Sequence, residues 1–371
     1  MTTTINNEHN KLNVPNLRFP EFQGEWETYK IQDVLRIGNG RDYKHLGTGD
    51  IPVFGTGGYM TSVTDYLYDG ETTFIGRKGT INKPYYYKGK FWTVDTLFYT
   101  HSFNGVTPHF VYCLFQTINW LRYIEASGVP SLSKDTIEKI KVHIPQIEEQ
   151  QKISKLLSLF DERIVCQNKV IEDLKKLKCA IIEKLYAEVK GTKYSYRQLF
   201  NIINERNKQL EYSNVLSASQ EKGMVSREDL NLDIQFERSN INTYKIVRNG
   251  DYVIHLRSFQ GGFAFSEKTG VCSPAYTILR PNELLVYGYL SYYFTSREFI
   301  QSLIIVTYGI RDGRSINVDE WLDMKVVIPS KEQQTHIVNI IKSIENKIKN
   351  EETYSNCLLN QKQYLLRQMF I

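Results

Sequence analysis

The sequence has only five cysteines, and no two of them stand at the spacing of a metal-ligand or redox pair. Such isolated cysteines are typical of reduced thiols in a cytosolic protein. No apolar run approaches the roughly 18 residues that a membrane-spanning helix needs. The polar beginning, MTTTINNEHNKLN, lacks the apolar centre of a signal peptide. We therefore expect a soluble, cytoplasmic protein with no membrane partner.

Strong charge of either sign is also lacking. Lys and Arg number 46 against 41 Asp and Glu, which gives a formal net charge of +5. This balance permits an anionic partner without requiring one, because a sequence-independent phosphate binder usually has a strongly basic stripe. With 371 residues, 41% of them hydrophobic, the chain is long enough for two or three domains with cores of their own.

Complete catalytic motifs are absent. The seven histidines form no HExxH, and no serine stands in GxSxG. The segment 76–80 has the residues of a phosphate loop in the wrong order, and Gly38-Asn39-Gly40 lacks the third glycine of a dinucleotide site. In Asn82-Lys83-Pro84-Tyr85, a lysine replaces the first proline of the motif with which amino-methyltransferases hold a flipped base. We expect no catalytic, cofactor or metal site in this chain.

An internal repeat is the strongest pattern. Residues 131–187 align with residues 315–371 at a constant offset of 184, without a gap. Each copy contains a strand-like segment, KVHIP or KVVIP, followed by a helix-like segment with Glu and Gln in its first turn. The repeat predicts two halves, each with a globular head and a long helix.

The helix-like segments have apolar residues at steps of three, four or seven, with charged residues between them. One long helix with a single apolar stripe is not stable alone, whereas two with matched stripes bury each other. We therefore predict a pair of long antiparallel coiled-coil helices with pseudo-twofold symmetry. The residues expected to pack between them are Ile153, Leu157, Phe160, Ile164, Leu174, Ile181, Ile337, Ile341, Ile344, Ile348, Leu358 and Leu365.

The segments before the two helices contain short β-like runs separated by Gly, Asn and Asp, and helix-like stretches near their ends. They align with each other only at their edges. The pattern predicts an α+β fold with two unlike heads. The expected parts are an N-terminal tail, a first head, a central helix, a second head and a C-terminal helix, at residues 1–26, 27–141, 142–190, 191–325 and 326–371.

Three strings taken together resemble a known family. They are VPNLRFPEFQGEWE near the start, IPVFGTGGYM followed by FIGRKGTINKPYYYKGKFWTVDTLFYT in the first head, and IPxxExQxxI at the start of each helix. With the half-chain repeat, they resemble the specificity (S) subunit of type I restriction-modification systems. The resemblance implies that each head is a target-recognition domain for one half of a bipartite site in double-stranded DNA, and that the helices are spacers.

The same resemblance implies that this chain is not itself an enzyme. Two modification subunits, which carry S-adenosylmethionine and methylate adenine, are expected to dock on the helices, and restriction subunits are expected to join them. Two unlike heads on a repeated rod agree with this, because a bipartite site needs two readers at a fixed spacing. A chain that leaves the chemistry and part of the phosphate contacts to partners also needs no strongly basic surface.

We expect DNA to be contacted by side chains of suitable chemistry that lie in exposed loops. Arg suits guanine, Asn and Gln suit adenine, and Ser, Thr and Lys suit phosphates or mixed contacts. Glycine-flanked turns and the loops before the repeated strands offer such side chains in both heads. The candidates are Arg77, Lys78, Thr80, Ser131, Ser133, Lys134, Arg257, Ser258, Gln260, Tyr308, Arg311, Arg314, Ser315 and Asn317.

Two other functions are compatible with the residues. The first is a protein-binding hub whose heads hold peptides, and salt-dependent DNA binding would distinguish it from a DNA reader. The second is a self-sufficient nuclease or methyltransferase with an unrecognised site. Turnover by the isolated chain would identify it.

Overall fold

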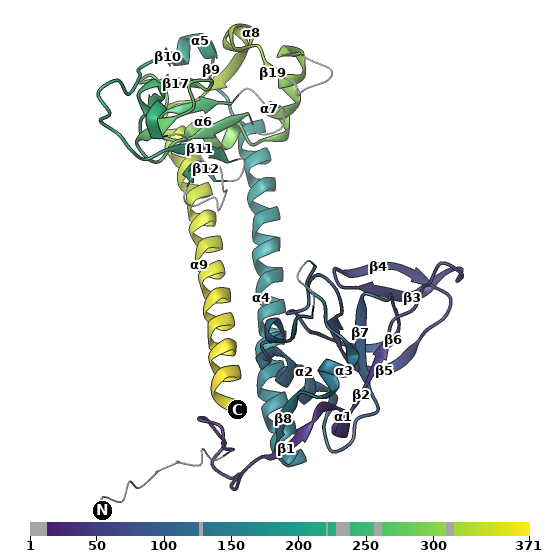
Figure 1. Ribbon diagram of the computed structural model, residues 1–371. Helices are drawn as coiled ribbons and strands as arrows, with labels where there is room; N and C mark the ends of the chain where they lie inside the picture. Colours follow the sequence, from purple (N-terminus) through teal and green to yellow (C-terminus); the bar gives the residue numbers. More distant parts are fainter. Residues whose placement is uncertain (1–12, 126–128, 220–221, 228–237, 256–261, 309–314) are drawn as a thin grey trace, which may run out of the picture. The chain divides into compact units, whose positions relative to one another are not determined.

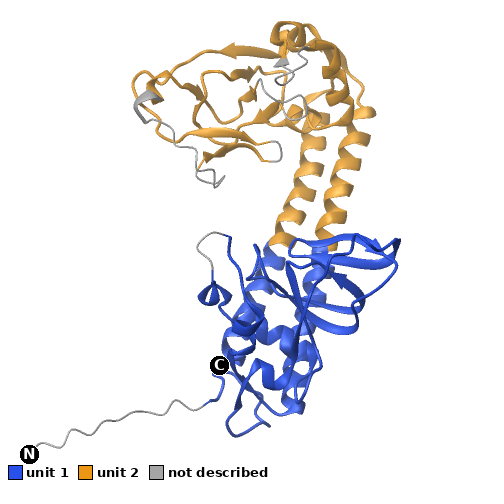
Figure 2. Cartoon of the chain, turned by 45° about the vertical axis from the view of Figure 1, so that its right-hand side comes forward, with its two compact units in different colours: residues 1–168, 353–371 blue, residues 169–352 orange. Residues whose placement is uncertain are grey.

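The structure, a computed structural model, describes residues 13–125, 129–219, 222–227, 238–255, 262–308 and 315–371. The chain divides into two compact units, one of residues 1–168 and 353–371 and one of residues 169–352 (Figure 2). Two long helices, α4 (Ile147–Ala187) and α9 (Lys331–Met369), each contribute one half to either unit (Figure 1). In the described ranges, no helix combines the length and the apolar character needed to cross a membrane.

The head of unit 1 is built on a six-stranded sheet with strand order β2-β7-β5-β6-β3-β4. Neighbouring strands are antiparallel, except β3 and β6, which are parallel. Helix α2 (Pro108–Thr117) packs on β5 and β6 and buries Phe110 and Phe115 in the main core of this unit. The strands are β2 (Arg36–Asn39), β3 (Thr48–Gly55), β4 (Gly58–Val63), β5 (Tyr68–Gly76), β6 (Tyr85–Thr93) and β7 (Leu97–His101).

The head of unit 2 has a different architecture. Its main sheet is antiparallel, with strand order β10-β17-β14-β15, and separate two-stranded ladders join β11 to β12, β13 to β16 and β18 to β19. The elements are β10 (Phe200–Ile203), β11 (Leu216–Ser219), β12 (Gly223–Ser226), β13 (Lys245–Val247), β14 (Tyr252–Ile254), β15 (Phe263–Phe265), β16 (Gly270–Cys272), β17 (Thr277–Pro281), β18 (Thr307–Tyr308), β19 (Ser315–Ile316), α6 (Tyr289–Tyr293), α7 (Arg297–Ser302) and α8 (Val318–Asp323).

Both heads join their helices through the same arrangement, which we call the repeated frame. It is a two-stranded antiparallel ladder with a one-turn helix after its first strand. The N–H of Ile31 donates to the carbonyl of Ile140 at 3.0 Å, and that of Tyr196 donates to Met324 at 3.1 Å. The elements are β1 (Glu27–Lys30), α1 (Ile31–Val34) and β8 (Lys141–Ile144) in unit 1, and β9 (Thr192–Ser195), α5 (Tyr196–Leu199) and β20 (Lys325–Ile328) in unit 2.

The repeated frame extends the repeat beyond the prediction from sequence. Residues 27–34 correspond to residues 192–199, but at an offset of 165 rather than 184. The heads between the two ends of the frame differ in length, so a gapless alignment finds only the second end. The fold class itself is confirmed: two unlike α+β heads and two long antiparallel helices.

A buried glutamine in each half ties the head to the start of its helix. The Gln150 side chain accepts from the N–H of Thr107 at 2.9 Å and donates to the carbonyls of Gly105 and Pro145, both at 2.9 Å. Its counterpart Gln334 is likewise buried. Gln334 accepts from the N–H of Val286 at 2.8 Å and donates to Leu284 at 2.9 Å and Pro329 at 3.1 Å. The repeated IPxxExQ string is therefore a structural joint.

The two helices pack antiparallel in each unit. In unit 1, Lys362 contacts Asp161 at 2.5 Å, and Ser355 donates to Asn168 at 3.0 Å. In unit 2, Lys178 lies 3.3 Å from Glu345, and Lys175 lies 2.7 Å from Glu352. In both units the residue number falls along one helix as it rises along the other, which defines the antiparallel direction.

The predicted packing stripe differs in burial along its length. Ile153, Leu157, Ile164, Ile337, Ile341, Ile348 and Leu358 are buried, and Phe160, Leu174, Ile181, Ile344 and Leu365 are half-buried. Near the C-terminal ends the buried position lies one residue later than expected, at Ile182 and Leu366. A straight helix drifts by about 20° per heptad against a strict seven-residue repeat, and this drift moves the next residue inward.

Candidate nucleic-acid interface

The candidate residues of the first head come from two segments that the structure brings together. The segment after β5 begins at Arg77, and it is hydrogen-bonded to the segment 130–132. The N–H of Gly79 donates to Pro130 at 3.0 Å, and the N–H of Leu132 donates to Arg77 at 2.9 Å. Lys78 and Ser131 form an isolated β-bridge. The sequence predicted these two segments separately, and in the structure they form one surface.

Glycines give this surface its shape. A Cβ on Gly76 would lie 2.2 Å from the carbonyl oxygen of Thr80, so a larger residue would force the turn open. Gly79 has a φ of +81°, a conformation that favours glycine. The turn leaves the side chains of Lys78 and Thr80 exposed. Both point away from a tightly fixed backbone, as side chains that contact a ligand need to do.

Arg77 is held more firmly than its neighbours. Its N–H donates to the carbonyl of Thr96 at 2.8 Å, and its guanidinium donates to the carbonyl of Asp95 at 3.3 Å. The guanidinium carbon also lies 5.9 Å from the centre of the Phe98 ring. These contacts fix the orientation of the side chain, which reduces the entropy lost when it binds a partner.

Ser133 and Lys134 have structural contacts. Ser133 precedes α3 (Lys134–Glu138), where its hydroxyl oxygen accepts from the N–H of Thr136 at 3.1 Å and the hydroxyl donates to Glu125 at 2.7 Å. Hydrogen bonds from Thr136 and Ser133 lower the pKa of Glu125. The Lys134 ammonium lies 3.6 Å from Glu138. Ser133 thus acts as a helix N-cap, and its contact with DNA stays a prediction.

Most candidates of the second head lie outside the described residues. These are Arg257, Ser258, Gln260, Arg311 and Arg314.

The remaining second-head candidates lie between α7 and β20 in the chain. Tyr308 pairs with Ser315 through the backbone of the β18–β19 ladder. Asn317 is the N-cap of α8, since its side-chain oxygen accepts from the N–H of Glu320 at 3.4 Å. Asn317 is the counterpart of Ser133 at the offset of 184, so both candidates cap the short helix before the repeated strand.

Arg41 is a candidate that the sequence analysis missed. It is exposed, and its N–H donates to Thr93 at 2.8 Å, beside the 95–96 turn that holds Arg77. The indole of Trp92 donates to the carbonyl of Arg41 at 2.9 Å. A Cβ on Gly40 would lie 1.9 Å from the carbonyl oxygen of Val94, so the chain must pass closely here. The Gly-Asn-Gly string before Arg41 was the available signal.

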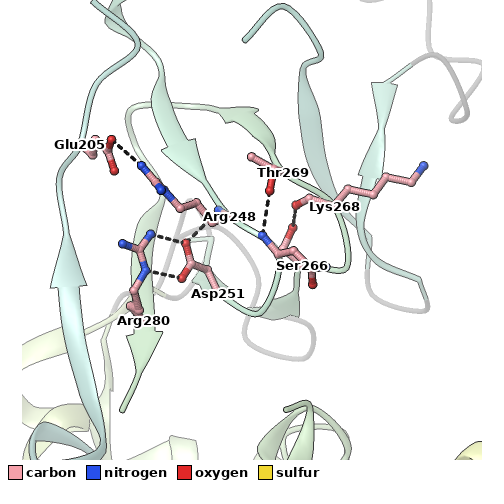
Figure 3. A network of polar contacts seen from close by, with 8 residues as sticks. Glu205, Arg248, Asp251, Ser266, Lys268, Thr269 and Arg280 are labelled. Carbon is pink, nitrogen blue, oxygen red and sulfur yellow. Dashed lines mark hydrogen bonds and ion pairs between the residues drawn. The ribbon is translucent and has the colours of Figure 1, made fainter. Parts of the chain in front are cut away.

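A buried carboxylate organises one side of the second head (Figure 3). Asp251 is only 2% exposed and accepts two bonds from Arg280, both at 2.9 Å, and one from the N–H of Arg248 at 2.8 Å. The Arg248 guanidinium reaches Glu205 at 2.9 Å. Hydrogen bonds to Asp251 raise the pKa of Arg280. Arg280 is therefore engaged within the fold and joins β17 to the turn before β14.

The described side chains do not assemble a metal centre. Among the residues that the structure describes, no group of three or more His, Cys, Asp or Glu is placed to hold a metal ion. Burial lowers the pKa of His101, His109 and His143. These histidines favour the neutral form.

Comparison with known proteins shows which proteins this chain is similar to. Residues 23–176 match the type I restriction modification DNA specificity domain. The chain is 26% identical over 210 residues to the type I restriction enzyme MjaVIII specificity subunit of Methanocaldococcus jannaschii, covering 49% of this chain and 46% of that protein. It is 27% identical over 156 residues to the EcoprrI specificity subunit of Escherichia coli, covering 39% of this chain and 38% of the relative. The matches thus span less than half the length of either relative.

Solved structures match over nearly the whole chain. The S subunit of the type I restriction-modification system of M. genitalium has a TM-score of 0.59 at 13% identity, covering 96% of this chain and 99% of that one. A structure described as the basis of complex assembly and conformational transition of the type I R-M system has a TM-score of 0.58 at 13% identity, covering 92% and 96%. At such low identity these matches establish the fold.

Proposed function

We propose that this chain, a relative of the specificity subunits of type I restriction-modification systems, is the subunit that selects the DNA sequence on which such a complex acts. Each head reads one half of a bipartite target in double-stranded DNA. The chain has no catalytic site of its own. S-adenosylmethionine is bound by a partner modification subunit, which transfers the methyl group to adenine.

One observation carries this proposal: the same frame is built twice around two unlike heads. The ladders β1–β8 and β9–β20, the buried glutamines and the helix starts correspond, whereas the sheets of the heads differ in strand number and order. An equal attachment with unequal heads is what two different half-sites require. Phosphate contacts position a reader, but base contacts specify the sequence, so the difference must lie in the heads.

The repeated frame also supports the proposed partners. Two equivalent frames and helix starts offer two equivalent docking sites, which fits two modification subunits on one specificity subunit. Restriction subunits join this core to give the complete complex. The half-site read by the first head is recognised at the surface of Arg77 and Lys78, with Arg41 beside it.

Methylation mapping tests the proposal. The chain is co-expressed with its modification subunit in a host without other adenine methylation, and methylated positions are mapped in genomic DNA. We expect a split motif with two defined parts and an undefined spacer. Replacing residues 35–140, the head between the two ends of the repeated frame, by the head of another specificity subunit should change one part and leave the other.

Two results would refute the proposal. The first is methylation at a continuous motif, or at the same motif after the head exchange. The second is methylation or cleavage by the isolated chain, which would make it an enzyme. The variant Lys141→Ala carries a substitution on β8, outside the proposed reading surface. It serves as the control for expression and folding in these experiments.

A further inference from the structure

Unit 1 has a groove where its head meets the last turns of α9. The groove has a volume of about 680 Å³. Its walls are the loop 82–84, the end of α2 at Gln116 and Thr117, and α9 from Gln363 to the end of the chain. The loop 82–84 directly continues the segment 77–80 of the proposed reading surface. One wall of the groove therefore follows directly in the sequence after the residues proposed to face DNA.

The lining of this groove suits an anion. Its two charged side chains are Lys83 and Arg367, and no aspartate or glutamate lines it. Both cations are exposed, and neither has an ion pair among the described residues. Asn82 and Gln363 add exposed amide groups. Cations together with amide donors are the usual contacts of phosphate oxygens.

The corresponding groove of unit 2 has a different lining. It has a volume of about 670 Å³, and the offset of 184 places Cys179, Ile182 and Glu183 where unit 1 has Gln363, Leu366 and Arg367. Its walls include three phenylalanines. Two of its lysines are paired, Lys175 with Glu352 at 2.7 Å and Lys178 with Glu345 at 3.3 Å. The unit 2 groove also contains Lys222, Lys349 and three glutamates, so the same location in the repeat is lined by acidic side chains in one half and by none in the other.

We propose that the groove of unit 1 holds backbone phosphates of the DNA duplex, with Lys83 and Arg367 as the contacting cations. This inference rests on the proposed function and goes beyond it, because it makes the end of α9 a DNA-binding element as well as a spacer. The contact is independent of sequence, so it adds affinity without changing the motif. An acidic segment of a partner protein is the other ligand that this chemistry allows.

The test measures the salt dependence of DNA binding. The full chain is purified with its modification subunit, and binding to two fluorescent duplexes, one with the methylated motif and one scrambled, is followed by anisotropy over a range of KCl concentrations. Each phosphate contact contributes about 0.9 to the slope of log K against log salt. The double variant Lys83→Ala/Arg367→Ala should therefore reduce the magnitude of this negative slope by about 1.8. It should also weaken the affinity at 0.1 M salt by roughly 60-fold.

Two further variants complete the test. The variant Lys83→Arg/Arg367→Lys keeps both charges and should retain the wild-type slope. Lys175→Ala, which alters the corresponding groove of unit 2, should leave the slope unchanged, because this lysine is already paired. The loss in the double alanine variant should be equal on both duplexes, and the methylation motif should stay the same.

Three results would overturn the inference. An unchanged slope in the double alanine variant would remove the phosphate contacts. A loss confined to the motif duplex would make these residues base readers. A normal slope with loss of the co-purified modification subunit would assign the groove to an acidic partner segment. Each of these leaves the split motif of the wild-type complex intact, whereas absence of a split motif would refute the proposed function itself.

Discussion

Lys362 and Lys178 occupy equivalent positions in the two halves, but their surroundings predict different energetic effects. The Lys362 side chain is 8% exposed and contacts Asp161 at 2.5 Å and Gln116 at 3.0 Å. The Lys178 side chain is 29% exposed and lies 3.3 Å from Glu345, which is 37% exposed. The test is to replace each lysine by methionine, which keeps the length and apolar stem of the side chain.

Burial sets the expected magnitudes. Removing one partner of a buried ion pair costs about 3–5 kcal/mol, because the other charge stays buried and unpaired. The Asp161 side chain is 32% exposed, so water recovers part of this, although its second carboxylate oxygen is buried without a hydrogen-bond partner. We expect Lys362→Met to destabilise unit 1 by about 2–3 kcal/mol. Lys178→Met, in a more exposed pair, should destabilise unit 2 by about 1 kcal/mol or less.

Native-state hydrogen exchange with mass spectrometry separates the two effects. Peptides from residues 355–369 report unit 1, and peptides from residues 172–187 report unit 2. The double variant Asp161→Leu/Lys362→Met should recover most of the lost protection, because replacing both partners of a buried pair by apolar residues is often neutral. Equal losses for the two single variants, or a double variant as unstable as Lys362→Met, would refute the reasoning.

Three further predictions concern the joint, the reading surface and the loop beside it. Gln150→Leu should destabilise unit 1 by about 2–4 kcal/mol, because it leaves buried backbone groups of the head without partners, and urea unfolding measures the change. If Arg41 contacts guanine, Arg41→Ala should weaken recognition of the half-site read by the first head by about 1–3 kcal/mol. Methylation mapping of the variant measures this, and an equal loss of selectivity at both half-sites would contradict it. The pKa of Glu125 is lowered from 4.5, so its ionised form stabilises the loop above that pH, and the contribution is lost as the pH falls through the lowered pKa. The thermal unfolding temperature of Glu125→Gln should therefore fall less between neutral and acidic pH than that of the wild type.

The long helices and the unlike heads followed from the sequence because the underlying signals are local and periodic. Apolar residues at heptad steps predict which side of a helix is buried, and a gapless repeat predicts equal elements. The first ends of the repeated frame do not align without a gap, because the two heads differ in length. The cap at Asn317 has a recognisable sequence signal, since Glu320 stands three residues after it as in a capping box.

The groove and the reading surface of unit 1 were harder to predict. The groove assembles from the loop 82–84, the end of α2 and the end of α9, which are far apart in the sequence. Its charge depends on which cations lack partners, and only the folded contacts decide this. The surface of Arg77 similarly requires the segment 130–132 to return to β5.

The buried glutamines have a consequence for how this protein can evolve. Gln150 and Gln334 contact only backbone groups of their heads: the N–H of Thr107 and the carbonyl of Gly105 in one, and the N–H of Val286 and the carbonyl of Leu284 in the other. Every residue type except proline offers these groups in the same geometry. This part of the attachment therefore does not depend on which side chains stand at residues 105, 107, 284 and 286. If the heads read DNA as proposed, exchange of one head would change one half of the target and leave the other half unchanged.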